Sequence, residues 1–241
     1  MPEAALKVPP AAATGALLTV RGLEGWYGES HVLHGIDIDV RAGEVITLLG
    51  RNGAGKTTTL RAIIGILGKR SGSIVYDGVE TVRMASRNIA RLGIGYVPEE
   101  RGIFASLTVH ENLMLPPRVK PGGMSVAEIH TLFPNLKERA GSQGTKLSGG
   151  EQQMLAIGRI LRTGAKLILL DEPTEGLAPV IVQQIGRTIQ QLKAQGYTIV
   201  LVEQNFRFAQ TLADRHFVIE QGRVVDMIPN AELDANIDKL H

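Results

Sequence analysis

The sequence predicts an α/β fold in which a mostly parallel sheet forms the core and a helical subdomain is inserted into the chain. Short apolar runs at 45–49, 167–170 and 198–202 alternate with segments of helical spacing, which is typical of strands in a parallel sheet. A glycine-rich loop follows the first of these runs and leads into a helix. Between about 99 and 163, helix starts occur with almost no strand pattern, which indicates the helical subdomain.

Composition limits the classes of function. With 241 residues and 44% hydrophobic content, the chain can bury a substantial core. The absence of cysteine excludes disulfides, thiolate metal sites and cysteine nucleophiles. No apolar run approaches the roughly 18–20 residues of a spanning helix, so we expect a soluble, cytoplasmic chain. The 26 basic and 24 acidic residues are scattered and give a net charge of +2, which argues against nucleic-acid partners.

The elements expected before the helical subdomain follow from periodicity. Residues 1–16 are rich in Ala and Pro without periodicity, which predicts a disordered leader. The strict alternation at 36–40 predicts a half-exposed strand, whereas the apolar run at 45–49 predicts a central one. The other elements expected here are strands at 18–20, 73–76 and 94–97 and a helix over 57–67.

Capping signals and turn residues place the later elements. Residues 108–111 and 125–128 fit the capping box, in which a hydroxyl and a carboxylate each accept a hydrogen bond from the other's backbone N–H. We also expect a helix over 180–194, a hairpin at the sheet edge within 217–225, and a polar tail over 229–241.

The glycine-rich loop fits the pattern G-x-x-x-x-G-K-[ST], which is that of a P-loop. Its backbone N–H groups converge on phosphates, the helix N-terminus adds a favourable dipole, Lys56 pairs with the β- and γ-phosphates, and Thr57 ligates Mg²⁺. The alternative is a glycine-rich turn without a ligand, which needs neither the lysine nor the threonine. The residues expected to contact nucleotide are Gly50, Arg51, Asn52, Gly53, Ala54, Gly55, Lys56, Thr57 and Thr58.

The apolar run at 167–170 ends in two acids, at the end of a strand where ligands bind in open α/β sheets. Asp171 fits a Mg²⁺ ligand, acting through water. Glu172 fits the general base that polarises the attacking water, and Lys56 completes the expected catalytic contacts. The alternative is a solvated strand end with two ordinary carboxylates.

The segment 147–153, Leu-Ser-Gly-Gly-Glu-Gln-Gln, resembles the signature motif of ABC ATPases. Ser148 and Glu151 also form a capping box, so the segment starts a helix in either interpretation. A cap does not require two glycines, which cost helix stability. We therefore expect Ser148, Gly149 and Gly150 to approach a γ-phosphate.

The resemblance to ABC ATPases covers nearly the whole chain from Leu17 to about Val225. It implies two subunits that sandwich two ATP molecules, with Ser148 and Gly150 touching ATP on the partner's P-loop. Tyr27 matches the aromatic residue that stacks on adenine, and the alternative is an ordinary turn aromatic. The implied organisation is a RecA-like P-loop core (17–98 and 164–228) with an antiparallel β subdomain, a helical subdomain (99–163) and the tail (229–241).

Two positions depart from the common ABC pattern. Glu99 stands where the family usually has a glutamine that joins the sheet to the helical subdomain, and a carboxylate there would bind Mg²⁺ more strongly than an amide. Gln204 stands where the family has a switch histidine. It can still donate to a γ-phosphate but cannot titrate near neutral pH. The alternative is that either position is only structural.

Four segments, 98–99, 132–136, 174–179 and 202–205, resemble one subgroup, the ATP-binding subunits of bacterial branched-chain amino acid importers. This resemblance implies a second ATPase subunit, separate transmembrane permease subunits and, indirectly, a periplasmic solute-binding protein as partners. It also implies a place on the cytoplasmic face of the inner membrane. There, Mg-ATP would close the dimer and hydrolysis would reopen it.

Three alternatives stay open at this point. A soluble ABC ATPase acting on DNA, ribosomes or cofactor assembly would share every phosphate-binding residue, although only about 90 residues separate Thr57 from Ser148 and leave no room for a coiled-coil arm. A transporter motor for another solute, such as urea or lipopolysaccharide, would share the subgroup segments. A nucleotide-gated scaffold without hydrolysis is disfavoured because Glu172 is present.

Overall fold

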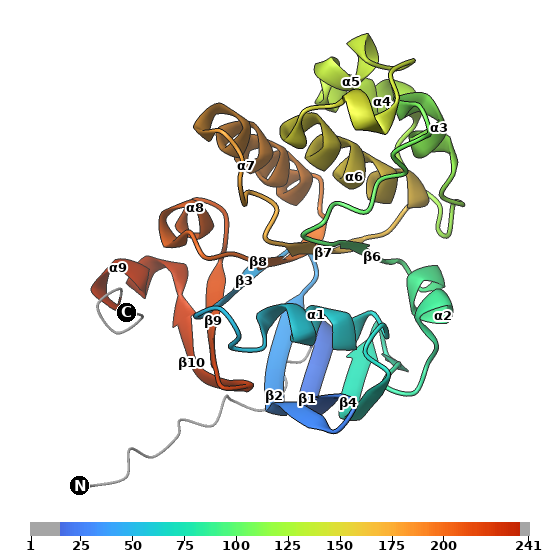
Figure 1. The fold of residues 1–241 in the computed structure, drawn as a ribbon. Helices are drawn as coiled ribbons and strands as arrows, with labels where there is room; N and C mark the ends of the chain where they lie inside the picture. Colours follow the sequence, from blue (N-terminus) through green and yellow to red (C-terminus); the bar gives the residue numbers. More distant parts are fainter. Residues whose placement is uncertain (1–14, 237–241) are drawn as a thin grey trace, which may run out of the picture.

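The computed structural model describes residues 15–236, and its ribbon shows a central sheet with helices on both faces (Figure 1). The strand order of this sheet is β10-β9-β3-β8-β7-β6, and all neighbours are parallel except β10 and β9. β3 is central and wholly buried, as its apolar run predicts. The bounds are β3 (Val45–Leu49), β6 (Ile94–Val97), β7 (Leu167–Asp171), β8 (Thr198–Val202), β9 (Arg215–Glu220) and β10 (Arg223–Pro229). The predicted α/β class is confirmed.

A second, antiparallel sheet has the strand order β2-β1-β4-β5. Its two longest strands pair along their length, with several register shifts where β-bulges interrupt the ladder. The sequence pattern marks only the strictly alternating part of these strands, because the bulges break the two-residue period elsewhere. The bounds are β1 (Ala16–Tyr27), β2 (Ser30–Arg41), β4 (Lys69–Tyr76) and β5 (Val79–Glu80).

The hydrophobic core contains two large clusters, one on each face of the central sheet. Helix α1 (Lys56–Ile63) lies on one face of this sheet, and α6 (Gly149–Thr163) and α7 (Pro179–Ala194) lie on the other (Figure 1). Because side chains alternate along a strand, Leu167 and Leu169 of β7 pack into the cluster that holds α1. Their neighbours Ile168 and Leu170 pack into the cluster on the other face. The loops at the ends of the strands are thereby held between two packed layers.

Helices occupy the segment between β6 and β7. Each of three helices begins at a capping box, with Thr108, Ser125 and Ser148 as the N-cap residues, so these predicted caps are confirmed. The helices of this segment are α3 (Val109–Met114), α4 (Val126–Leu132), α5 (Pro134–Glu138), the 3₁₀ turn η1 (Gly144–Lys146) and α6. Elsewhere the chain forms α2 (Ser86–Arg91), α8 (Phe206–Gln210), η2 (Asn230–Glu232) and α9 (Leu233–Asn236).

Two expectations about the core need correction. The helix expected over 57–67 ends at Ile63, because Gly65 adopts a left-handed backbone conformation (φ 79°) that an α-helix cannot continue. The strand at 36–40 is less exposed than its alternation indicates. Asp39 is buried because its carboxylate accepts a hydrogen bond of 3.0 Å from Arg215 on β9.

The two ends of the described chain also differ from expectation. β1 begins at Ala16, which lies opposite Arg41, so the expected leader is too long at its C-terminal end. Residues 1–14 lie outside the described part. The described part of the expected polar tail, 229–236, contains η2 and α9, and Leu233 is fully buried in a small cluster with Leu49 and Ile228. Asn230 also holds this segment, since its backbone N–H donates to the carbonyl of Asp214 and its side-chain oxygen lies 2.9 Å from Nε2 of His216.

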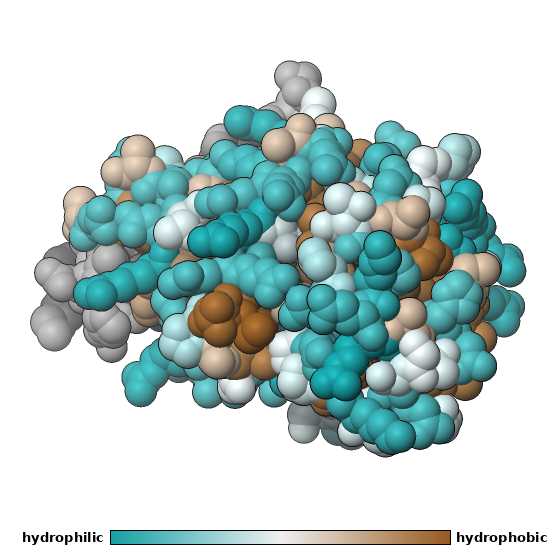
Figure 2. All heavy atoms as spheres, turned by 90° about the horizontal axis from the view of Figure 1, so that it is seen from above, coloured by the Kyte–Doolittle hydropathy of each residue, from teal (hydrophilic) through white to brown (hydrophobic). Residues whose placement is uncertain are grey.

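The surface over the helical layer is mostly hydrophilic, with separate hydrophobic spots (Figure 2). Within residues 15–236, no helix has the length and apolar character needed to cross a membrane. The large hydrophobic side chains that stay exposed there are Tyr27, Ile66, Phe104, Met114, Leu115 and Val180.

Candidate functional site

A cleft opens where the loop after β3 meets the C-terminal ends of the neighbouring parallel strands. Half of the residues predicted to bind phosphate or metal line it, together with the predicted base and Gln204. The lining residues are Val32, Asn52, Gly53, Gly55, Lys56, Thr57, Thr58, Glu99, Glu172, Glu175 and Gln204. The fold thus brings together side chains that are far apart in the sequence.

The loop between β3 and α1 needs glycine for two different reasons. Gly50 has φ 146°, and a Cβ there would lie 2.2 Å from the carbonyl oxygen of Ile219 on the adjacent strand. Gly55, at the N-cap of α1, has φ 109° and makes no side-chain cap. The first N–H groups of α1 therefore lack an intrahelical or side-chain partner and are free to bind an anion.

Lys56 lies folded over the loop. Its Nζ donates to the carbonyl oxygens of Gly50 at 2.8 Å and Arg51 at 3.2 Å, and lies 3.8 Å from a carboxylate oxygen of Glu172. The side chain is only 4% exposed, and this burial lowers the pKa of Lys56 against the opposing effect of Glu172. An arriving phosphate would add a second negative partner to the buried ammonium, beside the carboxylate of Glu172.

Asp171 is fully buried at the end of β7, and both carboxylate oxygens accept a hydrogen bond. The hydroxyl of Thr57 donates to Oδ1 at 2.8 Å, and the hydroxyl of Tyr96 donates to Oδ2 at 2.8 Å. Burial raises the pKa of Asp171, while the two hydrogen bonds oppose that rise. The hydroxyl and carboxylate oxygens of Thr57 and Asp171 are hard donors of the kind Mg²⁺ prefers, so the donor set fits this ion.

Glu172 adopts a left-handed backbone conformation (φ 45°), which is uncommon for a residue with a side chain. Its backbone N–H donates to the carbonyl of Val202 at 3.0 Å, which fixes the turn after β7. Its Oε2 accepts a hydrogen bond of 2.6 Å from the side-chain amide of Gln204. Burial, followed by a hydrogen bond to Glu175, raises the pKa of Glu172. The strain and these contacts hold the carboxylate in the cleft beside Lys56.

Replacing Glu175 with glutamine is expected to shift the acid limb of the ATPase pH profile to lower pH. A general base must be deprotonated, so the rate falls as pH drops through its pKa, and Glu175 raises the pKa of Glu172. The amide would instead donate to the Glu172 carboxylate and stabilise the charged form. Profiles of kcat between pH 5 and 8 measure this, with Glu138→Gln on the exposed surface of α5 as the control. An unchanged acid limb would contradict the prediction that Glu172, with its pKa raised by Glu175, is the general base.

Glu99 lies on the exposed rim of the same cleft, just after β6. Burial and the nearby carboxylate of Glu172 raise the pKa of Glu99. The surrounding acids concentrate negative charge at this rim, which favours a divalent cation. Its predicted role as a metal ligand stays a prediction.

Tyr27 lies at the C-terminal end of β1 and is 44% exposed. Its hydroxyl accepts a 3.5 Å hydrogen bond from Arg61 of α1, so the ring lies near the helix that follows the phosphate loop. An exposed ring near the predicted phosphate-binding loop is available for stacking on a base.

Replacing Tyr27 with alanine is expected to weaken ATP binding by roughly fivefold, because stacking contributes about 1 kcal/mol. Since stacking does not depend on the identity of the base, GTP binding is expected to weaken by a similar factor. Fluorescent nucleotide titration measures both. Tyr27→Phe keeps the ring and is expected to bind as the wild type does. Equal affinities for the alanine variant and the wild type would identify Tyr27 as a turn aromatic.

The predicted signature residues lie at the start of α6, on the face of the sheet opposite α1 (Figure 1). Ser148 is exposed and caps the helix, with its backbone N–H donating to Glu151 at 2.7 Å. Ser148, Gly149 and Gly150 are not among the residues that line the cleft. Gly150 also has a packing role, since a Cβ there would lie 2.7 Å from Ile181 on α7.

The structure adds residues to the site that the sequence patterns do not identify. The hydroxyl of Tyr96 donates a hydrogen bond to Asp171, as described above. No sequence motif identifies this role, because Tyr96 lies in a segment whose pattern predicts only a buried strand. Thr174 donates to the buried carboxylate of Glu203 at 2.7 Å. This contact joins the turn after Glu172 to the turn that carries Gln204, so it positions both.

Comparison with known proteins gives a consistent result. Residues 33–175 match the ABC transporter family. The chain is 45% identical over 218 residues to the high-affinity branched-chain amino acid transport ATP-binding protein BraG of Pseudomonas aeruginosa, covering 87% of this chain and 91% of BraG. It is 34% identical over 216 residues to the lipopolysaccharide export system ATP-binding protein LptB of Escherichia coli K12, covering 87% of this chain and 89% of LptB.

A solved structure has the same fold as this chain. It is the crystal structure of a nucleotide-free ATP-binding cassette from an ABC transporter, with a TM-score of 0.82, 24% identity, and coverage of 93% of this chain and 97% of that one. Because its sequence identity to this chain is low, this structure supports the fold alone. The family match and the relatives show the class of protein. The chain belongs to the ABC transporter family and is an ATP-binding, ATP-hydrolysing subunit of the ABC type.

Proposed function

We propose that Mg-ATP binds in the cleft and that this chain hydrolyses it with Glu172 as the general base. The single observation that carries this proposal is the convergence of Lys56, Asp171 and Glu172. Nζ of Lys56 lies 3.8 Å from a carboxylate oxygen of Glu172, and the hydroxyl of Thr57 donates a hydrogen bond to Asp171. Lys56 and the N–H groups of the loop bind the phosphates. Thr57 and Asp171 hold Mg²⁺, with Glu99 at the rim. Mg²⁺, when bound, neutralises charge on the phosphates.

Gln204 complements the base in this proposal. Its amide donates to Glu172 at 2.6 Å, so it orients the carboxylate, and a reoriented amide can donate to a γ-phosphate. Unlike an imidazole it carries no titratable proton. The pH dependence of turnover is therefore expected to come from the carboxylates of the cleft.

We propose further that two ATPase subunits act together. Ser148 is exposed at the start of α6 and outside the cleft of its own chain, which suits a group that completes a nucleotide site on a second subunit. The division into a P-loop core (17–98 and 164–228) and a helical subdomain (99–163) belongs to the same proposal. The second subunit is another copy or a related ATPase.

The transported solute is proposed to be a branched-chain or related amino acid. Support comes from the 45% identity to BraG, against 34% to the export protein LptB. In this role the chain docks on transmembrane permease subunits at the cytoplasmic face of the inner membrane. A periplasmic solute-binding protein delivers the solute to them, and the solute does not contact this chain.

Purification of the full chain from its native membranes in mild detergent tests the proposed partners. Recovery of multi-span proteins, a second ATPase and an amino-acid-binding protein supports the importer. Recovery of permease subunits with a binding protein for another solute, such as urea, or with lipopolysaccharide export components would replace the solute and keep the ATPase. Recovery of ribosomal, DNA-bound or soluble assembly proteins alone would overturn the transport role.

A further inference from the structure

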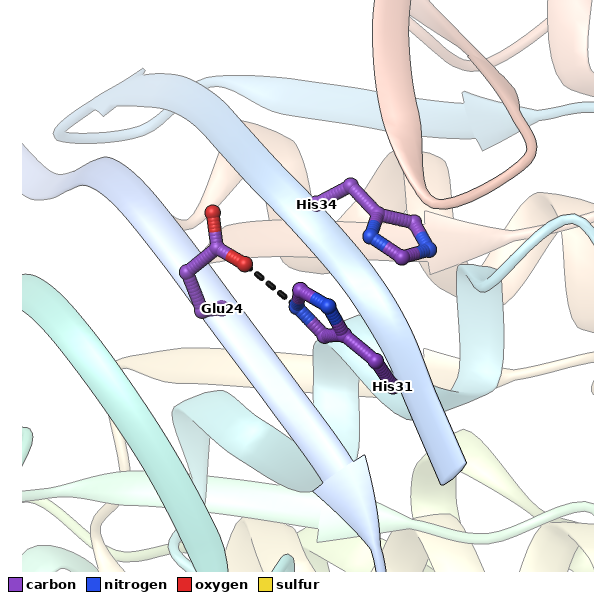
Figure 3. Close-up of side chains that lie close together, drawn as sticks. All are labelled: Glu24, His31 and His34. Carbon is purple, nitrogen blue, oxygen red and sulfur yellow. Dashed lines mark hydrogen bonds and ion pairs between the residues drawn. The ribbon is translucent and has the colours of Figure 1, made fainter. Parts of the chain in front are cut away.

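Two histidines and a glutamate cluster on the antiparallel sheet, apart from the residues that line the nucleotide cleft (Figure 3). One potential ligand atom from each of Glu24, His31 and His34 lies within 4.8 Å of the others. His31 Nε2 and the Glu24 carboxylate form a hydrogen bond, and the rings of His31 and His34 meet edge to face with centroids 4.1 Å apart. We propose that these three side chains form a binding site for a divalent metal ion of the zinc class.

A β-bulge assembles the cluster. Glu24 of β1 lies directly opposite His34 of β2, so their side chains share one face of the sheet. His31 is three residues from His34, and in a regular strand this odd spacing would place the two rings on opposite faces. The register shifts between Gly25 and Trp26, where one extra residue of β2 is accommodated, and this returns His31 to the face of His34.

The chemistry of the three side chains selects the ion. Imidazole nitrogen and carboxylate oxygen are the common ligands of Zn²⁺, and sites with three protein ligands keep a fourth position for water. Ligand atoms around a tetrahedral Zn²⁺ lie roughly 3.4 Å apart at bond lengths of about 2.1 Å, so small side-chain rotations suffice. The side chains of His31 and Glu24 are 37% and 33% exposed, which leaves access for the ion and its water. Mg²⁺ is disfavoured because it prefers oxygen ligands alone.

Surrounding contacts hold the cluster in position. The ring of Trp26 stacks on His31 with centroids 4.5 Å apart and an interplanar angle of 11°. The backbone N–H of His34 donates at 2.8 Å to the carbonyl of Gly222, in the turn between β9 and β10. That turn is itself fixed, because the N–H of Gly222 donates at 2.8 Å to Ala54 of the phosphate loop. The ring of His31 and the backbone of His34 are therefore held in place before any ion arrives, which lowers the cost of binding.

The stack on Trp26 supplies a direct test, since Trp26 is the one tryptophan of the 241-residue chain. Co²⁺ has a coordination chemistry close to that of Zn²⁺ and quenches the fluorescence of a neighbouring indole. The untagged full-length chain is titrated with Co²⁺ in excess Mg²⁺, which occupies the oxygen-rich cleft. We expect saturable quenching that Zn²⁺ reverses, and one Zn²⁺ retained per chain after equilibrium dialysis.

Single substitutions identify the ligands. Glu24→Gln and His34→Asn each remove one ligand without removing the stacked pair of Trp26 and His31, and each is expected to weaken Zn²⁺ binding at least tenfold. His110→Asn on α3, an exposed histidine outside the cluster, is the matched control and is expected to bind as the wild type does. Thermal melts with and without Zn²⁺ verify folding, and a rise in Tm is expected for the wild type and the control only.

The outcomes separate clearly. A tenfold or greater loss in both ligand variants, with the control unaffected, supports the site. Zn²⁺ binding of equal affinity in folded Glu24→Gln and His34→Asn variants, or no Zn²⁺ binding by the wild type at micromolar concentrations, overturns it. These measurements of metal binding do not depend on ATP hydrolysis, so they test the metal site separately from the proposed nucleotide chemistry.

Discussion

Replacing Glu172 with glutamine is expected to lower the rate of ATP hydrolysis roughly 100- to 10,000-fold, the contribution typical of a positioned general base. Glutamine has nearly the same shape as glutamate but cannot accept the proton of the attacking water. ATP binding should persist, because Lys56 and the N–H groups of the loop are unchanged. Single-turnover hydrolysis and equilibrium nucleotide titration measure the two quantities separately. Size-exclusion chromatography with ATP is expected to reveal an accumulated dimer.

A neighbouring carboxylate provides the control for this experiment. Glu175 lines the same cleft and contacts Glu172, so Glu175→Gln makes the same chemical change beside the proposed base. That variant is expected to keep turnover near neutral pH within about tenfold of the wild type, since the base remains. If Glu172→Gln hydrolyses ATP as fast as Glu175→Gln does, Glu172 is not the base and another group activates the water.

Replacing Lys56 with alanine is expected to weaken ATP binding roughly 100-fold. A hydrogen bond to a charged group contributes about 1.5–3 kcal/mol, and the ammonium would make such bonds to the phosphates in place of its bonds to Gly50 and Arg51. Isothermal titration with a non-hydrolysable ATP analogue and Mg²⁺ measures the change. AMP lacks the β- and γ-phosphates, so its weak binding is expected to change little.

Folding of the Lys56→Ala variant is expected to be intact. The side chain is 4% exposed and its pKa is lowered by burial, so the charged form is held at a cost that alanine removes. A Tm within a few degrees of the wild type is therefore expected. Lys137→Ala on the exposed surface of α5 controls for the loss of a positive charge at a distance. Equal ATP affinity in all three proteins would show that the loop does not bind phosphate through Lys56.

The sequence identifies the strands of the central sheet well because they are buried on both faces. The runs that become β3, β7 and β8 are continuous in apolar residues, and their bounds match those predicted to within one residue. The same is true of the helix that becomes α7. Capping boxes also predict helix starts correctly, since each box depends on residues only three positions apart.

Longer-range features were not predictable in this way. β1 and β2 extend far beyond their alternating parts, because bulges shift the face on which each side chain lies. The burial of Asp39 depends on Arg215, which is 176 residues away in the chain. Docking of α9 depends on a hydrophobic pocket that exists only once β3 and β10 are in place.

The proposed nucleotide chemistry could be predicted from the sequence alone, because the glycine-rich loop, the acids after β7 and the capped glycine pair are each contiguous motifs. The tertiary structure decided what supports and surrounds that chemistry. Tyr96 holds Asp171, Gln204 holds Glu172, and Glu24 meets two histidines through a bulged ladder. Such contacts join side chains brought together only by strand order and register, and no local pattern in the chain records them.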